Sequence, residues 1–208
     1  MVTKELYKKK IITVVILFVA SVASCINTIY LQDVLLNHIG TLVIIGLLLL
    51  DVYYGFMTFS SFLCISIFCL FHILGARYLY SLVPYNHWSI SMFGWDVQEY
   101  FHFSRNHYDR FVHFIFGILL FPFLMEWYSK RKNISYSNSI LFSWMSIQTF
   151  SLIYELIEWI VAITLSEKSA ENYNGQQGDM WDAHKDMALA MLGSTIMCLY
   201  YLYKRKRN

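Results

Sequence analysis

The chain has 208 residues, of which 57% are hydrophobic and only 14% are charged. In a soluble domain, about a quarter of the residues are charged. The composition therefore excludes a soluble globular protein and predicts an integral membrane protein. The net charge of +2 is small, and the basic residues gather at the two ends and in one loop, which indicates membrane topology and not nucleic-acid binding.

The N-terminal part predicts three membrane spans, because each apolar segment approaches the roughly 20 residues that cross a bilayer. They are expected at residues 11–30, 39–54 and 56–80. The lysines between residues 4 and 10 place the N-terminus in the cytoplasm, so the first span is expected to be a retained signal anchor. The polar residues between 32 and 38 are expected to form a turn on the outer side.

A long polar and aromatic segment, residues 81–107, follows the third span. It is expected to lie on the outer membrane surface. Residues 93–103 form either a short interfacial helix or a plain loop anchored by its aromatic side chains. Arg105 is expected to remain in water.

The C-terminal half predicts three further spans. They are expected at residues 108–128, 139–165 and 182–203. Pro122 is predicted to kink the fourth span, which membrane helices tolerate. Basic residues at 130–132 and 204–207 follow the fourth and sixth spans, so both termini are expected in the cytoplasm. The whole chain is therefore predicted to be one all-α domain, a polytopic membrane bundle of about six helices.

Ionisable residues inside the last three spans are the most informative feature of the sequence. They occur as three pairs with helical spacing: Asp109 and His113, Glu155 and Glu158, and Asp182 and Asp186. Residues three or four apart share one helix face, and charges within a bilayer are normally turned inward and paired. The topology places all three pairs in the outer half of the membrane, so we expect them to line one water-accessible, outward-facing pocket.

Several carboxylates at close range require compensating charge. Arg77, Arg110 and Lys185 are the nearby cations by sequence, and a divalent metal ion is the other solution, because carboxylates and imidazole suit Zn²⁺, Mn²⁺, Mg²⁺ or Ca²⁺. The sequence therefore predicts a divalent metal of unknown identity. Its candidate ligands are the six residues of the three pairs: Asp109, His113, Glu155, Glu158, Asp182 and Asp186.

The pocket suggests that the protein acts on or binds a lipid or cell-envelope precursor headgroup, and whether it is an enzyme is left open. Glu155 and Glu158 are the candidate catalytic residues, one of them acting as a general base toward a metal-activated water. The candidate substrate-binding residues are Tyr108, Arg110, Arg77 and Asp179. Arg110, with Arg77 or Arg105, would meet a phosphate group.

The same residues also allow purely structural roles. Asp109 is favourable at a helix start without any further role, and Asp179 and Asp182 are typical helix N-caps. Two other function classes also remain: a proton-coupled transporter, and a structural assembly factor in which the charges only join helices. His72 is expected to be a hydrogen-bonded core histidine. The oligomeric state is left open.

Three extended motifs resemble a known family. They are SRNHYDRxxH at residues 104–113, YELIEW at 154–159 and QGDxWDxxxDM at 177–187, with HILGARY at 72–78 and a Val-Pro pair at 83–84 before them. With these motifs, residues 70–195 resemble the YjdF-like family of bacterial inner-membrane proteins, a domain of unknown function. The resemblance implies a multi-pass membrane protein and no activity. A looser likeness, in pattern only, is to VanZ-like proteins, which are linked to glycopeptide resistance and the cell envelope.

Overall fold

The computed structural model describes residues 4–28 and 30–207. Regular structure within these residues is helical throughout, which confirms the predicted all-α bundle. Five helical segments are long and apolar enough to cross a membrane. Four of them are single helices: α2 (Leu31–Tyr54), α3 (Phe59–Arg77), α8 (Tyr136–Thr164) and α10 (Asp182–Arg207). The fifth consists of three consecutive helices, α6 (Tyr108–Leu119), α7 (Phe121–Glu126) and the π-helix η1 (Trp127–Arg131).

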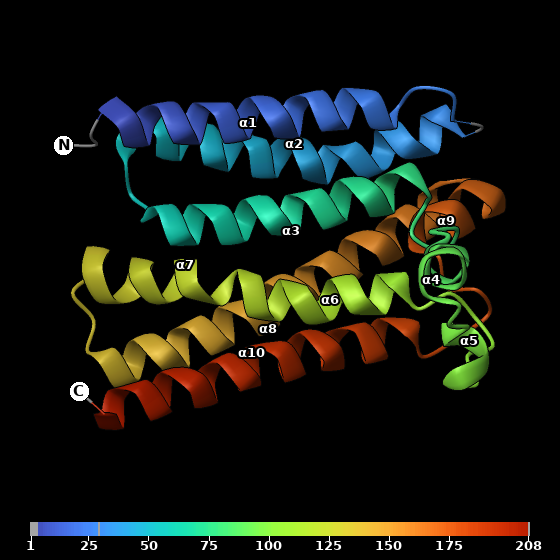
Figure 1. Ribbon diagram of the computed structural model, residues 1–208. Helices are drawn as coiled ribbons and strands as arrows, with labels where there is room; N and C mark the ends of the chain where they lie inside the picture. Colours follow the sequence, from blue (N-terminus) through green and yellow to red (C-terminus); the bar gives the residue numbers. More distant parts are fainter. Residues whose placement is uncertain (1–3, 29, 208) are drawn as a thin grey trace.

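The first predicted span corresponds to α1 (Lys4–Ser24), which runs along α2 over most of the bundle's length (Figure 1). Its lysines occupy the first turns, so its apolar part is shorter than in the other five segments. The helix ends before residue 30, and residue 29 of the expected span lies outside the described residues.

The two ends of the bundle differ in what they carry (Figure 1). Both chain termini lie at one end, which we call the terminal end. The opposite end, called the loop end, carries three short helices: α4 (Tyr85–Phe93), α5 (Val97–Tyr100) and α9 (Glu167–Asn174).

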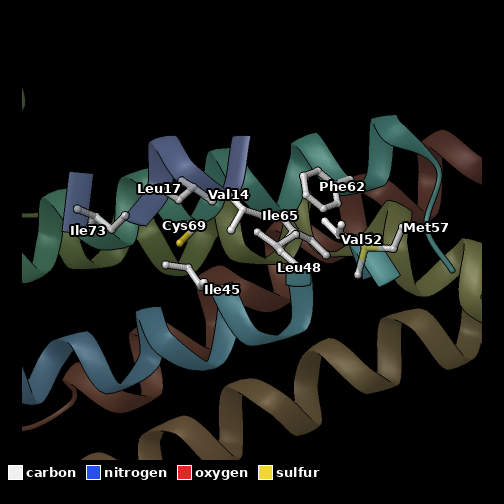
Figure 2. Packing of buried hydrophobic residues seen from close by; sticks show 10 residues of the cluster. All are labelled: Val14, Leu17, Ile45, Leu48, Val52, Met57, Phe62, Ile65, Cys69 and Ile73. Carbon is white, nitrogen blue, oxygen red and sulfur yellow. The ribbon is translucent and has the colours of Figure 1, made fainter. Parts of the chain in front are cut away.

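A hydrophobic core joins α1, α2 and α3 (Figure 2). Its buried residues are Val14, Leu17, Ile45, Leu48, Val52, Met57, Phe62, Ile65, Cys69 and Ile73. On its other side α3 packs against α6 and α7. The third helix therefore holds the N-terminal helices against the C-terminal ones.

A buried ion pair lies beside this core and was not anticipated from the sequence. Lys10 and Asp51 are 1% and 0% exposed, and Lys10 Nζ lies 2.5 Å from Asp51 Oδ2. Lys10 also donates to Met57 O at 3.0 Å, while Met57 N donates to Asp51 Oδ1 at 2.6 Å. Both charges have partners, so the pair joins α1 to α2. The sequence had assigned the lysines a role in membrane topology alone.

One expected turn is helical instead. The predicted outer turn at residues 32–38 belongs to α2, where Asn37 and His38 are buried. His38 is within hydrogen-bonding distance of Ser24 Oγ at 2.7 Å and Thr41 Oγ1 at 2.9 Å. Partners on the neighbouring helix thus allow these polar side chains to be buried, which hydropathy alone does not indicate.

Residues 93–103, expected as either one interfacial helix or a plain loop, are neither. Gly94 has a left-handed φ of 66° and ends α4, and Asp96 caps the separate short helix α5 by accepting from Glu99 N at 2.9 Å. Where a kink at Pro122 was predicted, the helix is interrupted: α6 ends at Leu119, and α-helix resumes at Phe121 in α7. Proline supplies no N–H to the preceding turn.

Candidate functional site

The polar residues predicted from the last three spans lie at the loop end. They come from the first turns of α6 and α10 and from the last third of α8. Nearer the terminal end, α8 and α10 are joined by hydrogen bonds from Trp144 to Thr195 at 3.0 Å and from Gln148 to Ser194 at 2.9 Å. The two helices separate toward the loop end (Figure 1). Glu155 and Glu158 therefore lie in the part of α8 that has moved away from α10.

Two glycines bring α6 and α10 into direct backbone contact. A Cβ atom on Gly117 would lie 2.2 Å from Ala190 O, and one on Gly193 would lie 2.2 Å from Phe114 O. Small residues permit such close approach of membrane helices. The contact fixes the distance between Asp109 and His113 on α6 and the aspartates of α10.

The outermost part of the site is an ion-pair cluster of five residues: Arg105, Arg110, Asp179, Asp182 and Lys185. Arg105 binds Asp182 in a bidentate manner, with Nη1 to Oδ1 at 2.7 Å and Nη2 to Oδ2 at 3.0 Å. Arg110 Nη2 lies 2.5 Å from Asp179 Oδ2 and 3.0 Å from Asp182 Oδ1. Lys185 Nζ lies 2.5 Å from Asp179 Oδ2. All three cations are therefore bound to Asp179 and Asp182.

Arg105 corrects an expectation, because its side chain is only 9% exposed and does not remain in water. It also donates to Gln176 O at 2.7 Å and to Gly175 O at 3.1 Å. In addition, Gln177 bonds to the backbone of Asn106 through both ends of its amide, at 2.9 and 3.1 Å. The segment before α6 and the segment before α10 are thus joined to each other.

Asp179 lies outside α10 and accepts from Trp181 N at 3.1 Å. The hydrogen bond from Lys185 is the largest influence on it, followed by those from Trp181 N and Arg110, and together they hold its pKa well below the usual range of an aspartate. It is therefore ionised at neutral pH.

The inner part of the site is a carboxylate–histidine group of five buried residues, each between 2% and 9% exposed: Asp109, His113, Glu155, Glu158 and Asp186. His113 Nε2 lies 3.7 Å from Asp109 Oδ1 and 3.6 Å from Glu155 Oε1. Donor atoms of Asp109, His113 and Asp186 all lie within 4.8 Å of one another, a spacing that suits a common metal ion. The predicted convergence of three helices is therefore present.

This group lacks a compensating lysine or arginine. Among the described residues, no such side chain comes within 4.0 Å of its four carboxylates, because the nearby cations all bind Asp179 and Asp182. Glu155 Oε1 and Asp186 Oδ1 are buried and have no hydrogen-bond partner within the described part of the chain. Buried carboxylate oxygens without partners are costly, so the arrangement favours an additional cation or protons.

A cavity of about 120 Å³ adjoins the group. It lies between α8, α10, and the end of α9 with the segment that follows it. Its lining comprises Glu155, Glu158, Trp159, Ala162, Asn174, Gln176, Asp182, Ala183 and Asp186. The volume holds several water molecules. Asn174 is 7% exposed, and its Oδ1 has no partner within the described residues. Asn174 and Gln176 were missed from the sequence because they lie in a polar segment without helical spacing to the other residues.

Two candidate substrate-binding residues are engaged elsewhere. Tyr108 donates from its hydroxyl to Phe71 O at 2.9 Å and packs among aromatic residues near α3. Arg77 donates to Ser24 O at 2.8 Å and to Ile26 O at 2.7 Å, so it binds carbonyl groups at the end of α1. Neither residue joins the carboxylate–histidine group.

His72 is a hydrogen-bonded core histidine, as predicted. Its Nε2 lies 3.2 Å from Asn37 O and donates to that carbonyl, and its Nδ1 accepts from the Tyr80 hydroxyl. Glu126 was not singled out by its spacing, yet it binds the start of α3, accepting from Thr58 N at 2.9 Å and Ser61 Oγ at 2.8 Å. It provides a buried glutamate remote from the loop end.

Comparison with known proteins gives the family. A family model described as "Predicted membrane protein (DUF2238)" matches residues 10–207. The chain belongs to this family. Membership, together with the five apolar helices, makes it a multi-pass membrane protein. This agrees with the family resemblance of the three motifs.

This family member is also 30% identical over 128 residues to the inner membrane protein YjdF of Escherichia coli (strain K12). The match covers 61% of this chain and 57% of the relative, so the chain spans less than two thirds of the relative's length. Its similarity to an inner-membrane protein places the family member in the cell membrane. No solved structure matches the chain.

Proposed function

We propose that this membrane protein binds a divalent metal ion in the carboxylate–histidine group and acts on a lipid or envelope-precursor headgroup at the loop end. The observation that carries the proposal is the separation of charges. Three cations are bound to Asp179 and Asp182. Asp109, Glu155, Glu158 and Asp186 are buried, and no described lysine or arginine lies within 4.0 Å of their carboxylates. Carboxylates and imidazole are suitable ligands for Mn²⁺, Zn²⁺ or Mg²⁺.

The adjoining cavity supports a reaction with water. A bound divalent ion supplies a Lewis acid. Glu155 and Glu158 line the cavity, and Glu155 Oε1 has no hydrogen-bond partner among the described residues, so Glu155 is available to accept a proton from a water molecule. A general base requires this kind of access.

The headgroup contact differs from the one expected from the sequence. Arg105 and Arg110 are bound to aspartates, so a phosphate group would have to displace an aspartate or bind a metal ion directly. Direct contact with the metal requires no rearrangement of the ion-pair cluster and is the route that we propose.

The metal content of the detergent-purified chain tests this function. We expect stoichiometric metal by elemental mass spectrometry in the wild type and a fall to background in the Asp109→Asn, Asp186→Asn double variant, which removes two carboxylates from one ligand set. Glu126→Gln is the control, since it neutralises a buried glutamate near the start of α3. Metal-free wild-type protein, folded by circular dichroism and resistant to reloading, would reject the proposal.

A separate measurement tests the action on headgroups. Phospholipid vesicles incubated with reconstituted wild-type protein should release phosphate or a phosphorylated headgroup, and Glu155→Gln should lower that rate by about 10²-fold or more, the typical contribution of a general base. Metal binding without any release would limit the function to metal binding.

A further inference from the structure

The donor atoms at the loop end divide into two neighbouring spaces that share one carboxylate. Asp109, His113 and Asp186 surround the first, with donor atoms within 4.8 Å of one another. The second is the cavity, which is lined by Glu155, Glu158 and Asp186 but not by Asp109 or His113. Asp186 therefore borders both spaces, and it is only 2% exposed.

The oxygens at the junction are free to bind cations. Asp186 Oδ1 and Glu155 Oε1 have no hydrogen-bond partner within the described part of the chain. Glu155 Oε1 lies 3.6 Å from His113 Nε2, so it stands between the first space and the cavity. A carboxylate has two oxygens and several acceptor positions, which allows Asp186 to contact a cation on each side.

The number of charges also favours two cations. The four carboxylates of the group carry four negative charges when ionised, and His113 is the basic residue among them. One divalent ion would leave two charges uncompensated in a buried region, whereas two divalent ions balance all four. Uncompensated charge within a membrane protein is unfavourable.

We infer that the carboxylate–histidine group holds two divalent metal ions bridged by Asp186, one bound with Asp109 and His113 and the other with Glu155 and Glu158 in the cavity. This inference rests on the metal-binding function proposed above. Paired metal ions about 3.5–4 Å apart are suited to holding the attacking and leaving oxygens of a phosphate ester. The ligand class that fits the site is therefore a phosphate ester, as in a phospholipid headgroup.

The test uses the full chain in detergent, stripped of metal with a chelator and reloaded with Mn²⁺ alone. After gel filtration, we expect two Mn²⁺ per chain by elemental mass spectrometry. The low-temperature electron paramagnetic resonance spectrum should be that of an exchange-coupled pair. Glu158→Gln should halve the bound manganese and give the six-line spectrum of an isolated ion. Glu126→Gln, a glutamate replaced near the opposite end of the same bundle, should still bind two.

The outcomes separate this inference from the proposed function. One uncoupled Mn²⁺ per wild-type chain would overturn the bridged pair and leave the metal-binding function standing. No bound Mn²⁺ in folded wild-type protein would overturn both. Two ions retained by folded Glu158→Gln would overturn the second position. If Glu158→Gln does not fold, the wild-type stoichiometry and spectrum still decide whether the pair exists.

Discussion

Asp182 and Asp186 lie one turn apart on α10, yet they have different surroundings. Asp182 accepts three hydrogen bonds from Arg105 and Arg110, whereas Asp186 Oδ1 has no partner among the described residues. The difference arises because Arg105 approaches from the segment before α6 and reaches only the first turn of α10. Two aspartates on the same helix face therefore differ: Asp182 is ion-paired, whereas Asp186 has an oxygen without a partner among the described residues.

At the same scale, the pH dependence of stability tests the ion-pair cluster. Because the folded-state pKa of Asp179 is depressed, its charge stabilises the fold above the pKa of an unfolded aspartate, about 3.9. This contribution is lost as the pH falls from there through the folded-state pKa. Asp179→Asn should therefore lower the melting temperature by a constant amount between about pH 8 and pH 5, and by less below about pH 4.

Thermal unfolding in detergent across this pH range measures the effect, with Asp96→Asn as a comparison. Asp96 also has a lowered pKa, chiefly from the backbone hydrogen bond of Glu99, but it lies on the exposed segment before α5. Equal melting temperatures of wild type and Asp179→Asn at neutral pH would show that the ion-pair cluster contributes nothing measurable.

At the scale of elements, the crossing of α6 and α10 determines whether the site forms. Gly117 and Gly193 let each helix contact the backbone of the other, and this crossing lies between the loop-end carboxylates and the apolar packing below. The apolar cluster around Phe121, Ile147 and Ala190 continues the same interface toward the terminal end. The two helices therefore hold Asp109, His113 and Asp186 at fixed distances.

Gly117→Ala tests this crossing. The added methyl group would overlap Ala190 O, forcing the helices apart, and overpacking of this kind costs about 1–3 kcal/mol. We expect a lower melting temperature and, if metal binds as proposed, weaker binding. Gly46→Ala is the matched control, because a Cβ atom there meets nothing within 4 Å. That change should be neutral or stabilising by about 0.5–1 kcal/mol, since alanine favours helix. Equal effects of both substitutions would contradict the close crossing.

At the scale of the whole molecule, the position of the termini bears on the number of spans. Five segments meet the length and composition of a membrane span, and an odd number of crossings would separate the termini across the bilayer. Both termini lie at the same end of the bundle (Figure 1). Six crossings, with α1 included, would also place both termini on one side of the membrane, so six spans remain the prediction to be tested.

A topology experiment tests that count. Reporters fused to each terminus should both be active on the cytoplasmic side, as the lysines of residues 4–10 and the basic residues of 204–207 predict. A single cysteine at Lys168 in α9, placed in a variant lacking the four native cysteines, should react with an impermeant reagent from outside. Termini on opposite sides would mean that α1 does not cross the membrane.

The whole-molecule packing also bears on the transporter alternative. Toward the terminal end, Gln148 and Ser194 bond to each other, and Phe121 and Ile147 are fully buried nearby. Glu126 is bound to the start of α3. These residues therefore do not outline a continuous polar path from the loop-end carboxylates, so the transporter ranks below the function that we propose.

The sequence by itself determined the membrane class, the helical fold and the convergence of the site. Long apolar segments leave the backbone no other partners in a bilayer than those within a helix, and spacings of three and four residues put Asp109 with His113 and Glu155 with Glu158 on common faces. The element ends were less predictable. Residues 32–38 belong to α2 and not to the expected turn. His38 is buried there beside Ser24, a residue of another helix, and the local sequence does not indicate this contact.

Only the tertiary structure decided which charges have partners. Arg105 and Arg77 look alike in sequence as cations near polar loops, but one binds Asp182 and the other binds carbonyl groups at the end of α1. The spacing grouped Asp182 with Asp186, but Arg105 and Arg110 bind Asp182 alone of the two. The pairing of charges depends on distances between segments about 70 residues apart, and local sequence patterns contain no information on such distances.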